Sequence, residues 1–427
     1  STHKYDAWDH FKVDPTLGGD EALEALITEI HKRGMKIVLD CSLNHVHPRH
    51  FAFQDLIQNG ENSKYKDWFT VFDYPLRLVH RPHLYSNTYK VGWDGNEKEY
   101  KTYLDKTIEE TKLPVDIKED DGPIIEPTYK AWWGVPDMPK VNLVNPEARQ
   151  WALDVTKYWI ENFDIDGWRM DVAKELDFSF WKDFRDIATS TKKDVLLISE
   201  IFGDTSQWLQ GDRFDGTMNY SFRETMTDFF AIKRTNTKEF ADSLANLFFM
   251  YSFEALSSCQ NLLSSHDVKR FLNRADKDTN AILGAIFLQA VFPGIAGIYY
   301  GDEIGLSGAD DPFNREPFPW HNTSSWNQEI LEHTTVLMQL KKHSSILKYG
   351  NFELVFVDED IVAFRRTLKD ESFLCIVNRD GSDKQVNIKS NAHSVDVEFG
   401  FCTSKLVNGE IQVQLNPKDI GVIISEK

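Results

Sequence analysis

Three acidic side chains stand at the ends of short apolar runs that are typical of β-strands. They are Asp171 after IDGWRM, Glu200 after VLLIS and Asp267 after LLSSH. Two carboxyl groups about 5–5.5 Å apart can cleave a glycosidic bond with retention, because one attacks the anomeric carbon while the other protonates the leaving oxygen. Taken alone, each of these acids is better explained as a helix N-cap or a solvated strand end. Together they predict such a site, provided that the fold brings them to one place.

The pattern of the surrounding elements predicts how that convergence arises. Between residues 19 and 301, strand-like runs alternate with amphipathic helical segments. The predicted strands are 35–40, 165–171, 195–200, 214–219, 262–267 and 296–300, and the predicted helices include 20–33, 146–162 and 178–189. This alternation indicates a parallel sheet covered by helices, either an open sheet or a (β/α)8 barrel. In a barrel, the three acids meet at the C-terminal mouth, with Arg169 and His266 beside them.

The composition narrows the classes of partner. The chain has 427 residues, and 67 acidic against 48 basic side chains give a formal net charge of −19. Such a surface repels phosphate backbones and anionic lipid, so we expect neither nucleic acid nor a membrane as a partner. The apolar stretch 281–300 is split by Pro293-Gly294 and is predicted to form a buried helix followed by a core strand. Four widely spaced cysteines predict free thiols.

Two segments interrupt the strand–helix alternation. Residues 47–140 are rich in Tyr, Trp, Pro and charge, and a stretch of this length between strands predicts a subdomain inserted over the site. Short strand-like runs joined by turns follow residue 345 and predict an antiparallel β-sandwich. We therefore expect a catalytic (β/α) barrel over residues 1–344, with the insertion at about 47–140, and a C-terminal β-sandwich domain over 345–427.

Several motifs resemble those of a known family. DCSLNH (40–45), GWRMDVAKE (167–175), ISEIFGD (198–204), LLSSHD (262–267) and YYGDEIGL (299–306) follow one another in the order and spacing of the α-amylase family of retaining glycoside hydrolases. MPKVNL (138–143) resembles the motif of the neopullulanase, cyclomaltodextrinase and maltogenic amylase group. The first four of these motifs, in this order and spacing, are already a specific signal, whereas one alone is weak.

The resemblance implies a role for each matching residue. Asp171 would be the nucleophile, Glu200 the general acid and then base, and Asp267 a binder of sugar hydroxyls in the transition state. Arg169 would hold Asp171 ionised and aimed, while Asp40 would be an electrostatic member of the mouth. The expected sugar contacts are Tyr5, His45, His266, Phe202 and the pair Trp132-Trp133.

The sequence also departs from the family pattern. Only six barrel strands are visible, so the first two strands of the (β/α)8 barrel would be missing from this chain. A homodimer formed through that missing N-terminal region is compatible with the resemblance. Phe202 and Gly203 stand where the group usually has Trp and His, which puts the preferred substrate in question without removing a catalytic group.

The sequence predicts neither a zinc site nor a required cofactor. The histidines of NHVHPRH (44–50) lack the Cys or HExxH context of a zinc site, so no metal site is predicted there. We expect no required cofactor. Calcium is compatible with the motif residue Asn44, although Glu175 replaces the His expected for that site.

The predicted function is a retaining glycosidase that cleaves α-1,4-glucosidic bonds in maltooligosaccharides, cyclodextrins or pullulan by double displacement. Two alternatives remain at this point: an α-glucan transglycosylase on the same scaffold, and a catalytically silent carbohydrate-binding protein. A silent relative is expected to have lost one of the three acids, and all are present. The expected partner is an α-glucan oligosaccharide. The expected location is the cytoplasm, with an extracellular one left open.

Overall fold

The computed structural model describes residues 4–83 and 97–427. The chain forms two compact units, and each is described by itself. The first unit comprises Ser1–Glu200 with Asp212–Phe214, and the second comprises Ile201–Gly211 with Asp215–Lys427.

Three parallel strands form the centre of the first unit: β1 (Val38–Cys41), β5 (Gly167–Met170) and β6 (Leu196–Ser199). All four residues of β5 are buried, as expected for an inner strand of a parallel sheet, whereas β1 is half-exposed. A Cβ on Gly167 would lie 2.5 Å from the carbonyl oxygen of Leu196 on β6. The glycine therefore permits the close approach of the two strands that end in Asp171 and Glu200.

Helices cover this sheet where the sequence predicts them. Asn145 caps the helix α4, since its side-chain oxygen accepts hydrogen bonds of 3.0 Å from the backbone N–H groups of Glu147 and Ala148. Asp177 caps α5, which packs against α4. The helical elements of this unit are η1 (Pro15–Leu17), α1 (Gly19–Lys32), α2 (Phe51–Asn59), η2 (Gly60–Asn62), η3 (Lys66–Trp68), α3 (Glu97–Thr111), η5 (Trp132–Gly134), α4 (Pro146–Phe163), η6 (Ala173–Glu175) and α5 (Phe178–Thr191).

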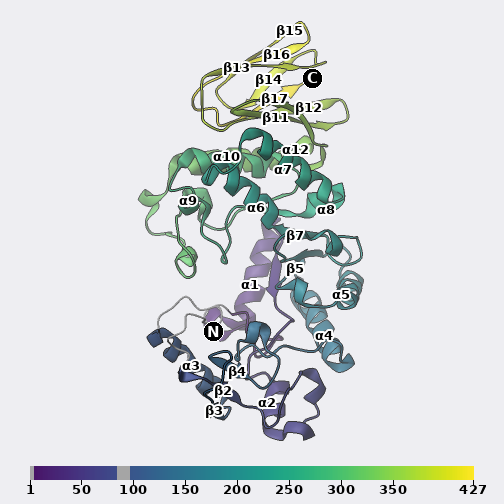
Figure 1. The fold of residues 1–427 in the computed structure, drawn as a ribbon. Coiled ribbons are helices and arrows are strands. Elements are labelled where there is room, and N and C mark those ends of the chain that lie inside the picture. The colour runs from purple at the N-terminus through teal and green to yellow at the C-terminus, as the bar shows by residue number, and fades with distance from the viewer. Residues whose placement is uncertain (1–3, 84–96) are drawn as a thin grey trace. The chain divides into compact units, whose positions relative to one another are not determined.

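Residues 47–140 contain more regular structure than the sequence pattern indicated. A three-stranded sheet in the order β3 (Val115–Ile117), β2 (Leu78–His80), β4 (Ile125–Pro127) lies there with α2 and α3 (Figure 1). Its strands have three residues each, which is too short for a period-two pattern to be recognised in the sequence. The insertion thus has a small sheet of its own.

The second unit holds another three parallel strands: β7 (Gly216–Asn219), β8 (Gln260–Leu262) and β9 (Ile295–Gly297). The predicted strand 262–267 is wrong, because β8 ends at Leu262 and the residues up to Asp267 leave the sheet. The hydroxyl of Ser264 accepts from the backbone N–H of Phe271 at 2.9 Å, and that of Ser265 from Asp267 at 3.2 Å. Serine side chains that bind the local backbone favour turns over a strand ladder.

The long apolar stretch forms the predicted buried helix, but the predicted core strand 296–300 is wrong in its extent and burial, since β9 ends at Gly297 and Ile295 is 39% exposed. Its first part is the helix α10 (Thr279–Val291), in which every residue from Ala281 to Val291 is buried, and its second part is β9. The other helical elements of this unit are η7 (Ser206–Trp208), α6 (Tyr220–Met226), the π-helical turn η8 (Thr227–Ala231), α7 (Thr237–Met250), α8 (Phe253–Ser258), α9 (Phe271–Arg274), η9 (Asp302–Ile304), η10 (Phe313–Arg315), η11 (Thr323–Ser325), α11 (Gln328–His343) and α12 (Ser345–Tyr349). Within the described residues, no helix has the length and apolarity that a bilayer crossing needs.

The chain ends in the predicted antiparallel β-sandwich. One sheet has the strand order β10-β11-β12-β17-β14 and the other β13-β16-β15. Ile376, Val413 and Ile424 are fully buried members of the core between them. The turn Asn408-Gly409 joins β15 to β16 with both residues at positive φ, as a two-residue type I′ hairpin requires. The strands are β10 (Glu353–Val357), β11 (Ile361–Leu368), β12 (Glu371–Asn378), β13 (Lys384–Lys389), β14 (Val395–Phe399), β15 (Thr403–Val407), β16 (Glu410–Leu415) and β17 (Gly421–Glu426).

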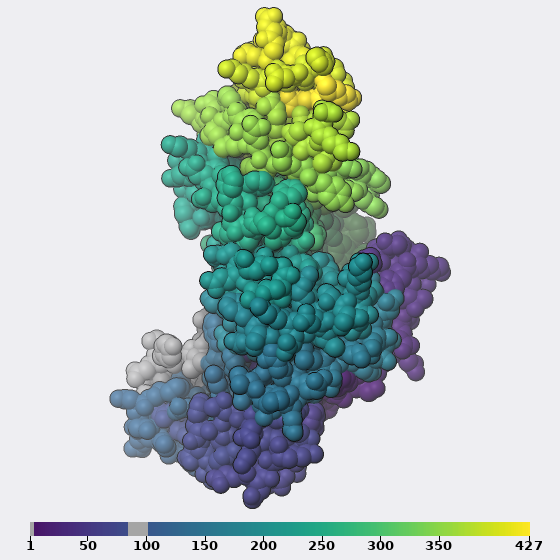
Figure 2. All heavy atoms as spheres, turned by 90° about the vertical axis from the view of Figure 1, so that its right-hand side faces the viewer, coloured from purple at the N-terminus to yellow at the C-terminus, as the bar shows by residue number. Residues whose placement is uncertain are grey.

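The sandwich packs on helices of its own unit. Arg366 on β11 is fully buried and donates hydrogen bonds to the carbonyl oxygens of Gly350, Asn351 and Val291, the last of which ends α10. Figure 1 shows α10 and α12 next to the sandwich, and Figure 2 shows its light green and yellow atoms adjoining the green helical layer without a break on the face in view. Arg366 therefore joins the β-sandwich to the helices on which it packs, through hydrogen bonds to backbone carbonyl oxygens.

Candidate active site

One arginine organises the acidic residues of the first unit. Arg169 on β5 places its Nη1 atom 2.9 Å from Oδ1 of Asp171 and 2.8 Å from Oδ1 of Asp40, and its Nη2 atom 2.6 Å from Oε1 of Glu200. Arg169, Asp171 and Glu200 are buried, with exposed fractions of 8%, 8% and 5%. Ion pairs that are shielded from water in this way are much stronger than those on a surface.

The parallel strands explain why these side chains meet. Asp40 on β1 is in register with Arg169 on β5. The ladder continues past the ends of the strands, since the backbone N–H of Asp171 donates to Cys41 at 2.9 Å and that of Glu200 donates to Met170 at 3.0 Å. Both acids are therefore fixed at the carboxyl ends of neighbouring strands, as the sequence predicted.

Burial and charge set the protonation of the site. Burial raises the pKa of Asp171 above its usual range, while the charge of Arg169 and a side-chain hydrogen bond with Glu200 pull that pKa down. A hydrogen bond between two carboxyl groups contains one proton, and it lowers the pKa of the group that accepts. In this pair the hydrogen bond favours the ionised form of Asp171.

The guanidinium remains charged in spite of its burial. Burial alone would lower the pKa of Arg169, but the nearby Asp40 and Glu200 more than offset that effect and raise it. Arg169 thus supplies a permanent positive charge between the acids.

Tyr5 completes this network. Its hydroxyl donates a 2.7 Å hydrogen bond to Oδ2 of Asp40 and accepts one of 3.4 Å from Nη1 of Arg169. The centre of its ring lies 5.7 Å from Cζ of Arg169. Burial raises the pKa of Tyr5, so the phenol is neutral. Its hydrogen bonds with Asp40 and Arg169 orient the side chain.

His45, Trp132 and Trp133 form an aromatic group in the same unit. The ring of the fully buried His45 stacks on Trp132 with centres 5.3 Å apart and planes at 21°, and Trp132 lies 5.6 Å from Trp133. Trp133 is 71% exposed and has a φ of 51°. This left-handed backbone conformation is uncommon for a bulky residue. Trp133 adopts it while its side chain faces solvent.

The remaining predicted site residues belong to the second unit. Nε2 of His266 lies 3.2 Å from Oδ2 of Asp267, and Nη2 of Arg315 lies 3.8 Å from Oδ1 of the same carboxylate. Phe202 is half-exposed and stacks on Tyr220 with ring centres 3.8 Å apart and planes at 19°. Arg315 and Tyr220 are contacts that the sequence reasoning did not single out. Arg315 could have been noticed as the only basic side chain in the run ADDPFNREPF.

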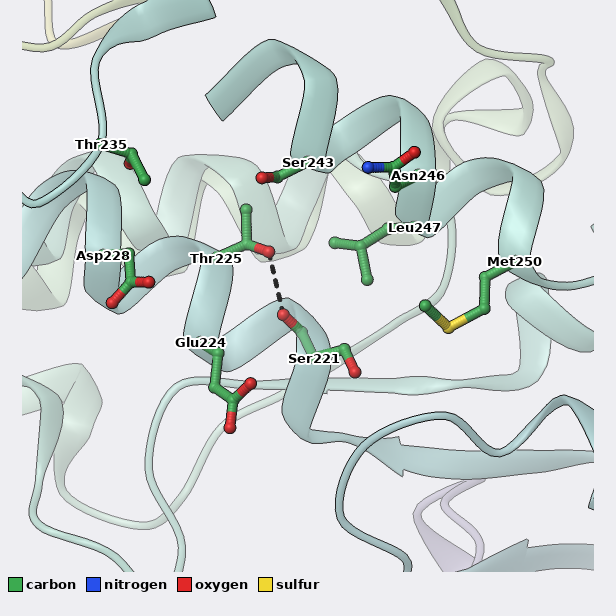
Figure 3. A pocket seen from close by; sticks show the side chains of 9 residues that line it. All are labelled: Ser221, Glu224, Thr225, Asp228, Thr235, Ser243, Asn246, Leu247 and Met250. Atoms are coloured by element: carbon green, nitrogen blue, oxygen red, sulfur yellow. Dashed lines mark hydrogen bonds between the residues drawn. The ribbon is translucent and has the colours of Figure 1, made fainter. Parts of the chain in front are cut away.

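A pocket in the second unit contains none of these residues. It has a volume of about 250 Å³ and lies between α6, η8 and α7 (Figure 3). Ser221, Glu224, Thr225, Asp228, Thr235, Ser243, Asn246, Leu247 and Met250 line it. A 3.0 Å hydrogen bond from the hydroxyl of Thr225 to the carbonyl oxygen of Ser221 follows the turn of α6 on one wall.

The side-chain oxygen of Asn44, the residue with which calcium is compatible, is buried and has no hydrogen-bond partner within residues 4–83 and 97–427. Nδ2 of the buried Asn44 lies 3.2 Å from Nδ1 of His45, and Glu175 forms an ion pair of 2.7 Å with Lys140. Among the residues that the structure describes, no three His, Cys, Asp or Glu side chains are grouped so that they could hold a metal ion. Calcium binding stays a prediction.

Comparison with known proteins adds an independent observation. The family model described as the catalytic domain of alpha-amylase matches residues 1–117 and 127–349. The chain belongs to the α-amylase family. The resemblance derived from the motifs is thereby confirmed, and so is the α/β fold class of this family, a (β/α)8 barrel followed by a β-sandwich.

Individual relatives lie within the group that the motif MPKVNL indicated. The chain is 34% identical over 422 residues to neopullulanase 2 of Thermoactinomyces vulgaris, covering 98% of this chain and 64% of that protein. It is 33% identical over 394 residues to the cyclomaltodextrinase of Geobacillus thermopakistaniensis, covering 92% and 59%. The chain thus spans about three-fifths of the length of these curated relatives. The crystal structure of the debranching enzyme from Nostoc punctiforme superimposes with a TM-score of 0.82 at 28% identity, covering 99% of this chain and 83% of that one.

Proposed function

We propose that this protein is a retaining glycoside hydrolase that cleaves α-1,4-glucosidic bonds in maltooligosaccharides, cyclodextrins or pullulan. The observation that carries the proposal is the contact of Asp171 and Glu200 with the two terminal nitrogens of Arg169. This arrangement places two buried carboxyl groups side by side at neighbouring strand ends. Double displacement at an anomeric carbon needs such a pair.

In the first step, a carboxylate oxygen of Asp171 attacks C1 of the sugar in subsite −1. The bond from C1 to the glycosidic oxygen breaks, and Glu200 transfers its proton to that oxygen, so the leaving sugar departs as a neutral alcohol. The product is a glycosyl-enzyme linked through Asp171. The positive charge of Arg169 favours the ionised form of Asp171 before the attack.

In the second step, water replaces the leaving sugar. Glu200, now ionised, takes a proton from the water, whose oxygen attacks C1 and releases Asp171 as a carboxylate. Two inversions at C1 give net retention, so an α-linked substrate yields an α-anomeric product.

The other predicted residues bind the sugar rings in this proposal. Tyr5 and His45 contact the ring in subsite −1, and the exposed face of Trp133, with Trp132 behind it, receives another ring, because aromatic faces pack well against sugars. Asp267 binds hydroxyl groups more strongly as the ring flattens in the transition state. The names of the relatives support cyclodextrins and pullulan as substrates.

We also propose a cytoplasmic location. All four cysteines, namely Cys41, Cys259, Cys375 and Cys402, are free thiols. This agrees with a reducing compartment, in which thiols remain unpaired.

The anomeric configuration of the first product tests the mechanism. Fresh hydrolysate of maltotriose or β-cyclodextrin, followed by proton NMR before mutarotation, is expected to show the α-anomer. Early accumulation of the β-anomer would contradict double displacement. A parallel assay on β-cyclodextrin, pullulan and soluble starch identifies the substrate, and the absence of hydrolysis of all three would contradict the proposed activity.

A further inference from the structure

The turn that carries Asp267 lies beyond the end of its strand. Pairing of β8 ends at Leu262, and Ser265 pairs with Val268 across a tight turn that has His266 and Asp267 at its tip. The backbone N–H of Asp267 donates to the hydroxyl of Ser265 at 3.2 Å. The strand ladder that fixes Asp171 and Glu200 therefore does not extend to this acid, so other contacts must hold the turn.

A single buried amide supplies most of those contacts. Asn314 in η10 is fully buried, and its Nδ2 donates to the carbonyl oxygens of His266 at 2.8 Å and Val268 at 3.0 Å, with a longer contact of 3.4 Å to Ser265. Only a donor can face three carbonyl oxygens, so the orientation of the amide is unambiguous. Its two short hydrogen bonds lie on either side of Asp267.

The neighbours of Asn314 hold it against the turn. Nε of Arg315 donates a second hydrogen bond to the carbonyl oxygen of His266 at 3.0 Å. Gly308 passes so close that a Cβ there would lie 2.5 Å from the carbonyl oxygen of Phe313, and its own carbonyl oxygen accepts from the backbone N–H of Arg270 at 3.1 Å. Gly308 thus contacts η10 through close packing on Phe313, and it contacts the residues after the turn through its hydrogen bond with Arg270.

We propose that Asn314 is a positioning residue for Asp267. This inference rests on the proposed function, because it assumes that Asp267 binds the sugar in the transition state. Asn314 acts on the backbone of the turn and sets the direction in which the Asp267 carboxylate points. A displacement of about 1 Å in such a group can cost on the order of 100-fold in rate.

The isosteric substitution Asn314→Asp tests this role. It replaces the donor with an oxygen that repels the three carbonyl oxygens at nearly unchanged volume. We expect kcat to fall roughly 10- to 100-fold, with a much smaller change in KM, since Asp267 is proposed to act mainly in the transition state. Asn314→Gln, which keeps a donor, is expected to recover part of the lost kcat. Asn322→Asp in the same segment, at an exposed position, is the matched control and is expected to leave kcat unchanged.

A double-mutant cycle distinguishes positioning from general damage. If Asn314 acts through Asp267, adding Asn314→Asp to Asp267→Asn lowers turnover of 4-nitrophenyl α-maltoside little beyond Asp267→Asn alone. Losses that multiply in the double variant would overturn the proposal, as would normal kcat in a folded Asn314→Asp protein. If Asn314→Asp does not fold, Asn314→Ala takes its place in the cycle.

The same cycle separates this inference from the proposed function. Near-normal turnover in Asp267→Asn would contradict the role assigned to Asp267 itself, and the positioning role would fall with it. Impaired turnover in Asp267→Asn together with normal turnover in Asn314→Ala and Asn314→Asp would contradict the positioning role alone. Circular dichroism and thermal unfolding of each variant show whether lost activity reflects lost structure.

Discussion

The Nη2 atom of Arg169 on β5 lies 2.6 Å from the Oε1 atom of Glu200, which directly follows the neighbouring strand β6. The same guanidinium binds Asp171 through its other terminal nitrogen. Both proposed reacting groups therefore share one fixed charge, and the predictions below follow from that arrangement.

Removal of either carboxyl group is expected to abolish most of the activity. Asp171→Asn removes the nucleophile and Glu200→Gln removes the transferable proton, so each should lower kcat by roughly 10⁴-fold, as for members of other catalytic groups. Steady-state hydrolysis of β-cyclodextrin or maltotriose measures the effect.

The matched control is Glu161→Gln, which removes an exposed carboxylate paired with Lys157 on α4. Its kcat should equal that of the unmodified protein. Near-normal turnover in Asp171→Asn or Glu200→Gln would contradict the assignment of the catalytic pair.

The dependence of activity on pH is expected to move when Asp40 loses its charge. The negative charge of Asp40 is one of the effects that raise the pKa of Asp171. Asp171 reacts only when ionised, so kcat/KM rises as the pH passes through that pKa. Asp40→Asn lowers this pKa and should shift the acidic limb of the kcat/KM profile to lower pH. A limb that stays in place or moves upward would show that Asp40 does not act on Asp171.

Trp133 is expected to matter for binding and not for stability. Its side chain is 71% exposed, so Trp133→Ala should change the unfolding temperature little, while the loss of a stacking surface raises KM several-fold. Phe249→Ala is the control, since that side chain is 80% exposed on α7 and is expected to leave KM unchanged. Equal KM values for both variants would remove Trp133 from the proposed sugar-binding surface.

Gly167 is expected to be intolerant of a methyl group. Gly167→Ala places Cβ 2.5 Å from the carbonyl oxygen of Leu196, and this overlap should cost roughly 1–3 kcal/mol of unfolding free energy. Denaturant titration measures the loss. Gly34→Ala adds a methyl group to open space at a positive φ, so its loss reports backbone strain without crowding. An unfolding free energy of Gly167→Ala equal to that of the unmodified protein would contradict the crowding argument.

The sequence predicted those parts of the fold in which local pattern and tertiary structure agree. Three elements lie within one or two residues of their predicted bounds, namely β5, β6 and α4. Apolar runs mark the two strands, and the cap residue Asn145 marks the start of the helix. The contact of Asp171 with Glu200 followed from the rule that parallel strands end at one edge.

Other features depend on contacts that are distant in the sequence. The turn at Asp267 was predicted as strand because LLSSHD begins with an apolar pair, and its real shape depends on Asn314, which is 47 residues away in the chain. Arg315 and Tyr220 were missed for the same reason. Among the sandwich strands, β14 and β16 alternate apolar and polar residues in the sequence, whereas β15 has no such pattern and is defined by its pairing with β16.

The hydrogen bond between Asp171 and Glu200 has a consequence for how a sugar enters. Without substrate, the two groups that we propose to act on opposite sides of a glycosidic bond are engaged with each other. An arriving ring has to come between them and offer replacement partners, so part of its affinity is consumed in opening that contact. Under the proposed mechanism we therefore expect a loosely fitting substrate to leave the pair closed, and a ring that separates the two groups to be the one placed for cleavage.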